Sequence, residues 1–161
     1  MIFYEVDTDN YVVKIFNEEI YDLDIFNIDE VEDFIKNIFK NFVKTYKLKG
    51  DVLLNIYIDL YYGIIVEVKK EDSFYDSDEI DARVVFHLNN AFLYEVDYFY
   101  ILDNTNIKNA NVYFYNNKFY LELTDEISIS DKYKLSEACD IIWDDRSFEI
   151  INKAIKLKLA S

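Results

Sequence analysis

The side chains that most often carry out chemistry are scarce in this sequence. There is one histidine, His87, and one cysteine, Cys139. A zinc site that uses more than one histidine is therefore excluded by count, and no partner residues make His87 part of a recognisable triad. A Cys139–His87 pair would arise only by chance. The spacing of Cys139 on an apolar helical face favours a buried structural thiol.

Phosphate-binding and metal-binding patterns are also missing. With only two glycines the chain has no glycine-rich phosphate loop. The carboxylate pairs Asp22/Asp24 and Asp144/Asp145 could hold a cation, but they lack the spacing of a calcium loop, so capping and solvation are favoured. A hydrolase stays open because acids are plentiful, although no pair is singled out. We therefore predict a protein that is not an enzyme, with no catalytic, cofactor-binding or metal-binding residues and no cofactor. The sequence does not identify its partner-binding residues.

The net charge of -15 limits the classes of partner. Such a chain repels phosphate backbones, so we expect no direct binding to nucleic acid. Two functional interpretations remain: an acidic surface that meets a protein with a basic or mixed surface, or a mimic of nucleic acid. A third interpretation is that the charge only keeps an aromatic-rich protein in solution. The lone cysteine fits a reducing compartment, and the start MIFYEVDTDN is not a signal peptide. No apolar run approaches the roughly 20 residues of a membrane helix, so we predict a cytoplasmic protein without a membrane partner.

Residues 1–70 are predicted to form an N-terminal α+β unit around one amphipathic helix. Apolar residues recur every three or four positions through residues 29–47, with Asp29 as the expected N-cap and Gly50 just past the end. Strands are expected at residues 1–6 and 11–16, and residues 17–28 are expected to be irregular or a short helical turn. Alternating apolar residues in 52–59 and 64–69, joined by a turn that contains Gly63, predict a hairpin whose apolar face lies on the helix.

Residues 83–161 are predicted to form a second α+β unit. The acidic stretch 71–82 is expected to be a linker or surface loop, since the periodicity lapses there. Beyond it we expect a strand at 83–87, a helix from Asn89 or Asn90 to about Leu102, and a hairpin through Asn116–Asn117, so that strand–helix–strand–strand is repeated. The segment FLYEVDYFYIL also alternates like a strand. Two helices should end the chain, one capped by Ser130 or Asp131 and one by Asp144 or Asp145. In both units we expect antiparallel sheets that are covered by helices.

Several stretches resemble the MecA family of Clp-ATPase adaptors. YVVKIFNEEIYDLDIF is similar to the opening strand and Asp-Leu turn of that family, and helix 29–47 and GIIVEVKK (Gly63–Lys70) occupy matching places. VYFYNNKFYLEL (Val112–Leu123) resembles the family's C-terminal hairpin, and LSEACDIIWDDRSFEIINKAI (Leu135–Ile155) resembles its closing helical pair. The chain departs from the family at Asn116–Asn117, where an Asn-Gly turn is usual, at Cys139–Asp140, where a glycine is usual, and in its shorter linker.

The resemblance implies that the protein is a non-catalytic adaptor, which links two proteins and does not make or break covalent bonds. One half would bind a client protein and the other would dock on a ClpC-type unfoldase, so that the adaptor presents the client to the unfoldase for proteolysis. The alternative is an acidic inhibitor, for example a phage or mobile-element protein, whose carboxylates mimic nucleic acid and occupy a basic cleft. A mimic requires carboxylates spaced like phosphates on one face. An adaptor requires two separate surfaces, at least one of them with exposed apolar anchors.

Overall fold

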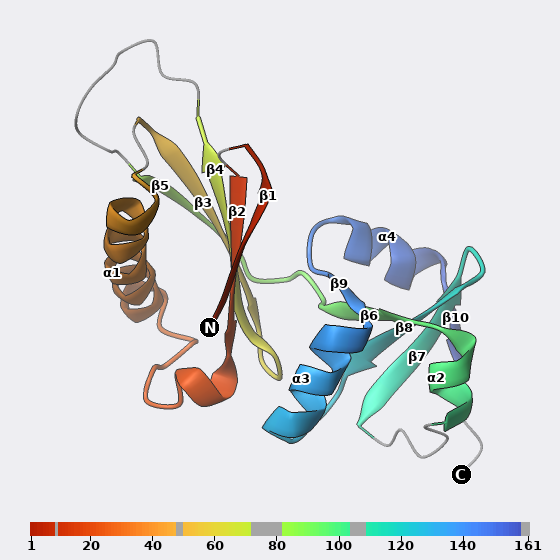
Figure 1. Cartoon of the computed structure of the whole chain (residues 1–161). Coiled ribbons are helices and arrows are strands. Elements are labelled where there is room, and N and C mark those ends of the chain that lie inside the picture. Colours follow the sequence, from red (N-terminus) through yellow and green to blue (C-terminus); the bar gives the residue numbers. More distant parts are fainter. Residues whose placement is uncertain (9, 48–49, 72–81, 104–108, 159–161) are drawn as a thin grey trace. The chain divides into compact units, whose positions relative to one another are not determined.

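The computed structural model describes residues 1–8, 10–47, 50–71, 82–103 and 109–158. The chain divides into two compact units, Met1–Leu88 and Asn89–Ser161. Each unit contains one five-stranded sheet and at least one α-helix (Figure 1). The predicted α+β class is confirmed.

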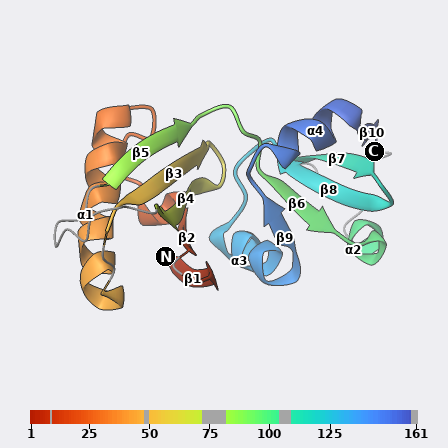
Figure 2. The same ribbon diagram turned by 90° about the horizontal axis from the view of Figure 1, so that it is seen from above.

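The first unit is a sheet with one long helix on one of its faces. Its strands, in the order β1-β2-β4-β3-β5, are antiparallel to their neighbours except that β5 runs parallel to β3. A short 3-10 helix, η1, and the helix α1 lie between β2 and β3 in the chain. Within this unit, α1 runs alongside the sheet (Figures 1 and 2). The bounds are β1 Ile2–Asp7, β2 Asn10–Phe16, η1 Asn17–Glu19, α1 Ile28–Tyr46, β3 Val52–Asp59, β4 Gly63–Lys70 and β5 Ala82–His87.

The last strand of the first unit corrects the predicted domain boundary. We predicted that the second unit begins at Arg83, but β5 pairs with β3 from Val52↔Ala82 to Tyr57↔His87. Val84 and Phe86 of β5 pack against the core that α1 covers, so burial of these side chains holds the strand in the first sheet. The boundary therefore follows Leu88. Most of the predicted linker 71–82, namely residues 72–81, lies outside the described residues.

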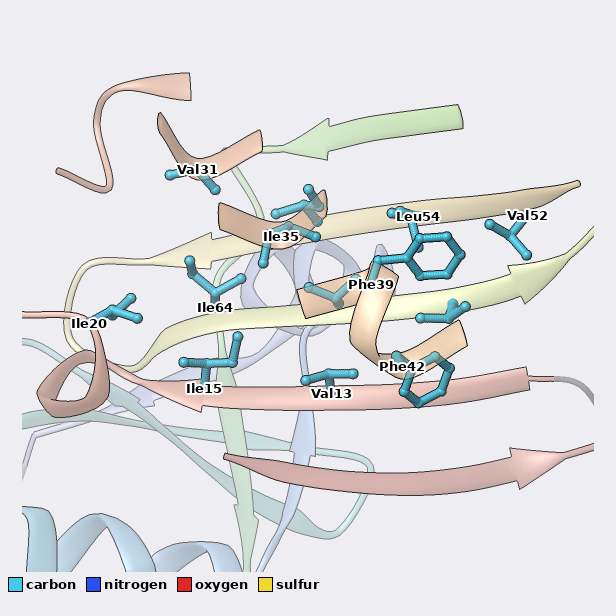
Figure 3. Packing of buried hydrophobic residues seen from close by; sticks show 13 residues of the cluster. Val13, Ile15, Ile20, Val31, Ile35, Phe39, Phe42, Val52, Leu54 and Ile64 are labelled. Atoms are coloured by element: carbon cyan, nitrogen blue, oxygen red, sulfur yellow. The ribbon is translucent and has the colours of Figure 1, made fainter. Parts of the chain in front are cut away.

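The core of the first unit is the contact between the apolar stripe of α1 and the sheet. Val31, Ile35, Phe39 and Phe42 are the buried residues of the helix, at steps of four, four and three. This spacing places them on one face, as the sequence predicted. Alternate residues of the strands point toward them (Figure 3). The buried strand residues of this cluster are Val13, Ile15, Val52, Leu54, Ile56, Ile64, Val66 and Val68.

The ends of α1 differ slightly from the expectation. The N-cap is Asn27, whose side-chain oxygen accepts a hydrogen bond from the Glu30 amide at 3.4 Å. The predicted N-cap, Asp29, instead lies in the first turn of the helix. The carboxylate of Glu30 accepts a hydrogen bond from the amide of Asp24 at 3.1 Å, so the first turn of the helix is bonded to the segment that precedes it. At the other end the left-handed residue is Lys47, with φ of 50°, ahead of the predicted Gly50.

Both predicted hairpins are present, and their turn residues have positive φ. Gly63 follows the β3–β4 turn with φ of 129°. Asn116 and Asn117 join β7 to β8 with φ of 48° and 62°. These angles at two successive residues are those of a type I′ turn, which matches the twist of the flanking strands.

The second unit contains an antiparallel sheet in the order β10-β7-β8-β6-β9. The helix α4 packs on the face that carries Leu93, Tyr113 and Tyr120, through Ile150. Within this unit, α3 lies on the opposite side of the sheet from α4 (Figures 1 and 2). The bounds are β6 Leu93–Val96, α2 Tyr98–Asp103, β7 Ala110–Tyr115, β8 Lys118–Leu123, α3 Ile129–Ala138, β9 Asp140–Ile142, α4 Arg146–Lys153 and β10 Ile155–Leu157.

The helix predicted from Asn89 or Asn90 to Leu102 is wrong. The segment forms the strand β6 and then the short helix α2. Leu93 is buried on one side of the sheet, and Tyr94 and Val96 are buried on the other, so the two-residue period determines the structure here. Asp97 then accepts a hydrogen bond from the Tyr100 amide at 2.7 Å, which starts the new helix.

The two C-terminal helices are present with small differences. α3 is capped by Ser128, whose hydroxyl accepts from the Asp131 amide, rather than by Ser130 or Asp131. α4 follows Asp145 as predicted. It ends at Lys153, so Ile155 begins the strand β10 instead of continuing the helical face.

A strand–helix–strand–strand repeat is present, but its second copy begins at β6, because the predicted first strand, residues 83–87, is β5 of the first sheet. In the first unit β2 pairs with β4, and β4 pairs with β3. In the second unit β6 pairs with β8, and β8 pairs with β7. In both cases the first strand of the repeat joins the third, and the third joins the second, all antiparallel. Each unit then adds one strand at either edge of this three-stranded centre.

The contact between α1 and the sheet leads to a stability prediction. Phe39→Ala should lower the free energy of unfolding by roughly 3–5 kcal/mol, because it opens a cavity between α1 and the sheet. Phe26→Ala is the matched control, since that ring is 77% exposed and Phe39 is 7% exposed. Urea unfolding of both variants is the measurement. Equal losses would mean that the stripe of α1 does not form the core.

The two glycines offer a second matched pair. A Cβ at Gly63 would lie 2.1 Å from the Ile15 carbonyl oxygen and 2.9 Å from the Asn17 nitrogen. At Gly50 nothing lies within 4 Å, and the only obstacle is the φ of 90°. Gly50→Ala should therefore cost about 1–2 kcal/mol, from backbone strain alone. Gly63→Ala should cost clearly more in thermal or urea unfolding, because two backbone segments must also separate. A smaller loss at Gly63 would contradict this account of the turn.

Candidate protein-binding surfaces

His87 has the contacts of a structural residue. It ends β5, and its Nε2 lies 3.0 Å from Oδ1 of Asn55 on β3. Its ring stacks on Tyr57, with centroids 4.4 Å apart and planes at 13°. An amide oxygen and a phenol ring orient the imidazole, but neither is a nucleophile that it could activate. These contacts therefore tie β5 to β3 and do not form a catalytic pair.

Cys139 is the C-cap residue of α3 in the second unit, and its side chain is half-buried. Burial raises the pKa of the thiol to about 11, and the carboxylates of Asp97 and Asp140 act in the same direction. The thiol is therefore protonated near neutral pH and is a poor nucleophile. His87 belongs to the first unit and Cys139 to the second, so neither unit by itself contains a cysteine–histidine pair.

One acid of each predicted carboxylate pair has a local structural role. Asp24 accepts the Phe26 amide at 3.0 Å in the segment before α1. Asp144 accepts both the amide and Nε of Arg146, at 3.1 and 2.9 Å, at the start of α4. Among the described residues no group of three or more histidine, cysteine or acidic side chains is arranged to hold a metal ion. These bonds match the capping role that the sequence favoured.

A cavity of about 510 Å³ lies within the second unit. It is bordered by the end of β6, the start of α2, the β7–β8 turn and the segment around Cys139. Lys118 is the one basic residue of its lining, and its Nζ is 2.9 Å from the Glu95 carboxylate. The acidic residues of the lining are Glu95, Asp97, Glu137 and Asp140. The lining is therefore negative overall.

Exposed aromatic rings lie beside this cavity. Tyr98 and Phe99 on α2 are 56% and 71% exposed. Tyr98 also lines the cavity, and its ring centroid is 6.0 Å from that of Phe119. Large apolar side chains that remain in water are candidates for burial by a partner. We call Tyr98 and Phe99 the α2 pair.

The first unit has its own pair of exposed rings. Tyr21 and Phe26 lie between η1 and α1 and are 88% and 77% exposed. Leu23 and Ile25, from the same segment, pack against the core instead. The segment therefore keeps two apolar side chains in the fold and leaves two rings outside it. We call Tyr21 and Phe26 the loop pair.

Neither pair was recognised from the sequence. Residues 17–28 were expected to be irregular or a short helical turn, and α2 was expected to belong to a longer helix. The only signal is that two aromatic residues stand in the acidic stretch 17–33, which contains no lysine or arginine. None of the described helices is long and apolar enough to cross a membrane.

The raised pKa of Cys139 predicts slow alkylation. At pH 8 iodoacetamide should modify the folded protein roughly tenfold more slowly than the urea-unfolded protein. The raised pKa lowers the fraction of Cys139 that is thiolate, and the greater nucleophilicity of each thiolate offsets only part of that loss. The rate in the folded state should rise as the pH approaches about 11. Mass spectrometry of timed samples is the measurement. Faster alkylation in the folded state would mean an activated thiol and would reopen an enzymatic role.

Comparisons with known proteins do not add to these observations. No protein-family model, no curated protein and no solved structure matches the chain.

Proposed function

We propose that this protein is a non-catalytic adaptor that binds one protein partner through each unit. The observation that carries the proposal is that each unit has its own core and its own pair of exposed aromatic rings. The loop pair belongs to the first unit and the α2 pair to the second. Aromatic side chains are frequent anchors of protein interfaces because they bury a large area with few rotatable bonds.

Two linked binding units are enough for the proposed mechanism. A partner held by one unit is kept at a high effective concentration near a partner held by the other, and no new contact between the partners is required. The protonated thiol of Cys139 and the amide and ring contacts of His87 support a role without bond chemistry. The lone cysteine is consistent with the reducing environment of the cytoplasm, where we propose that the adaptor works.

The resemblance to the MecA family suggests a specific pair of partners. One unit would dock on a ClpC-type unfoldase, and the other would hold a client protein for unfolding and proteolysis. The acidic net charge of -15 supports partners with basic or mixed surfaces.

A nucleic-acid mimic is the competing function. A mimic uses rows of free carboxylates and has little use for exposed rings. Around the loop pair, Glu19, Asp24 and Glu30 accept hydrogen bonds from backbone amides of the protein itself. These bonds and the exposed rings both favour the adaptor.

The proposal predicts that the two pairs of rings bind different partners. Tyr21→Ala/Phe26→Ala and Tyr98→Ala/Phe99→Ala, made in the full chain, should each lose one partner and keep the other. Pull-downs from a lysate of a low-GC Gram-positive bacterium, followed by binding of the purified partners and of a purified ClpC-type ATPase, are the measurement. A bridged complex of both partners should form only with a protein that keeps both pairs.

A matched control separates the rings from exposed apolar area in general. Leu60→Ala/Ile155→Ala removes one exposed apolar side chain from each unit, 47% and 64% exposed, and should leave both partners bound. Retention of every partner by both ring variants would reject the adaptor. Competition by duplex DNA, with a steep loss of binding as salt rises, would support the mimic instead.

A further inference from the structure

The loop pair is carried by a segment that is folded rather than loose. We define the recognition loop as residues 20–28, between η1 and the first turn of α1. Ile20 is buried, and Leu23 and Ile25 pack on the same core cluster. These three side chains fasten the loop to the first unit. Tyr21 and Phe26, from the same segment, are the rings that remain in water.

Hydrogen bonds fix the backbone of the recognition loop at several points. The Leu23 amide donates to the Ile20 carbonyl at 2.9 Å, and the Asn27 amide donates to the Asp24 carbonyl at 3.0 Å. The Asp24 carboxylate accepts the Phe26 amide at 3.0 Å, and the Asp24 amide donates to Glu30 at 3.1 Å. Hydrogen bonds within the protein thus fix the backbone near both rings in the unbound protein. A preorganised segment loses little conformational entropy on binding, which favours a specific contact.

The negative charge around the recognition loop favours a partner with a positively charged surface. From Asn17 to Ile35 the chain carries acids and neither lysine nor arginine. These acids are Glu18, Glu19, Asp22, Asp24, Asp29, Glu30, Glu32 and Asp33. A second copy of this chain would bring its own net charge of -15 to the contact. Anionic lipid and nucleic acid would be repelled as well, so the complementary surface is a basic protein surface.

We infer that the recognition loop inserts Tyr21 and Phe26 into an apolar pocket of a partner protein whose rim carries lysine or arginine. The inference rests on the proposed adaptor function and identifies one of its two contacts. The rings supply buried apolar area at the centre, and the acids meet the basic rim around it. This arrangement matches the apolar centre and polar rim of protein interfaces. Asp22 and Asp29 flank the rings in sequence, and they are the acids chosen for the test.

Site-specific crosslinking in the full chain tests where the partner lies. The photo-crosslinker p-benzoylphenylalanine is placed at position 21, 26 or 60 in separate proteins, and crosslinked proteins are identified by mass spectrometry. The same protein should be captured at positions 21 and 26 but not at position 60. Its crosslinked peptides should map to an apolar pocket with lysine or arginine at its edge. Absence of capture at 21 and 26 above the level at 60 would overturn the inference.

Binding of the purified captured protein then tests the chemistry. Tyr21→Ala/Phe26→Ala should weaken the affinity by on the order of tenfold or more, as expected for central aromatic anchors. Asp22→Asn/Asp29→Asn should slow association and flatten its dependence on salt, because rim charges act mainly on the on-rate. Glu5→Gln/Asp51→Asn changes the net charge equally, at two acids of the first unit outside the acid-rich stretch 17–35, and it should leave both quantities near those of the unmodified protein.

The outcomes separate this inference from the adaptor proposal. Capture of a second copy of the chain, or of a partner with an acidic pocket rim, would overturn the inference while leaving two-site binding intact. An affinity that is unchanged by Tyr21→Ala/Phe26→Ala would overturn it as well. If the loop partner behaves as expected but Tyr98→Ala/Phe99→Ala loses no second partner, the inference stands and the adaptor proposal fails.

Discussion

Removal of the apolar stripe of α1 from water is the interaction on which the first unit depends. The stripe presents four buried side chains from one side of a helix, and a surface of alternating apolar strand residues covers it. Strands β2, β3, β4 and β5 supply that surface. Even the recognition loop uses the same core, since Leu23 and Ile25 pack against it. The position of Tyr21 and Phe26 in water is therefore a consequence of where their neighbours are buried.

The second unit reaches the same strand pairing with different covering helices. Its α2 corresponds to α1 in the order of the repeat but has six residues, and α4 covers one face of the sheet instead. The rings of Tyr98 and Phe99 on this short helix are left largely uncovered. In both units the exposed aromatic pair thus lies in the connection that leads from the first strand of the repeat to the second. The two units thus share one pattern of strand pairing, but the first presents its exposed rings from a loop and the second presents them from a short helix.

How much the sequence could predict depended on whether one pattern or two were present. Helix α1 was located within one residue at each end because its apolar spacing and its charges agree, and Gly63 and Asn116–Asn117 marked the hairpins. The stretch around Tyr94 carried both a helical and a strand period, and the choice between them depended on a sheet that lies elsewhere in the sequence. Strand β5 was recognised, but alternation does not say which sheet a strand joins.

Side-chain burial is also hard to predict from residue type. Lys132 is fully buried, with Nζ 3.8 Å from Glu126, although a lysine in a helix is ordinarily expected at the surface. For the candidate surfaces, composition could not separate Tyr21 and Phe26 from Leu23 and Ile25, because all four are apolar and only packing against the core divides them.

The order of strands in the first sheet has a consequence for the nascent chain. β1 and β2 are synthesised first, but the inner edge of β2 pairs with β4, which begins only at Gly63, after η1, α1 and β3 have been made. Until then β2 leaves the ribosome with one row of backbone amides and carbonyls unpaired beside Val13 and Ile15. An open apolar edge of this kind invites pairing with other chains. The nascent chain is therefore most prone to aggregation from the synthesis of β2 until β4 has left the ribosome. Chaperone protection would matter most during that interval.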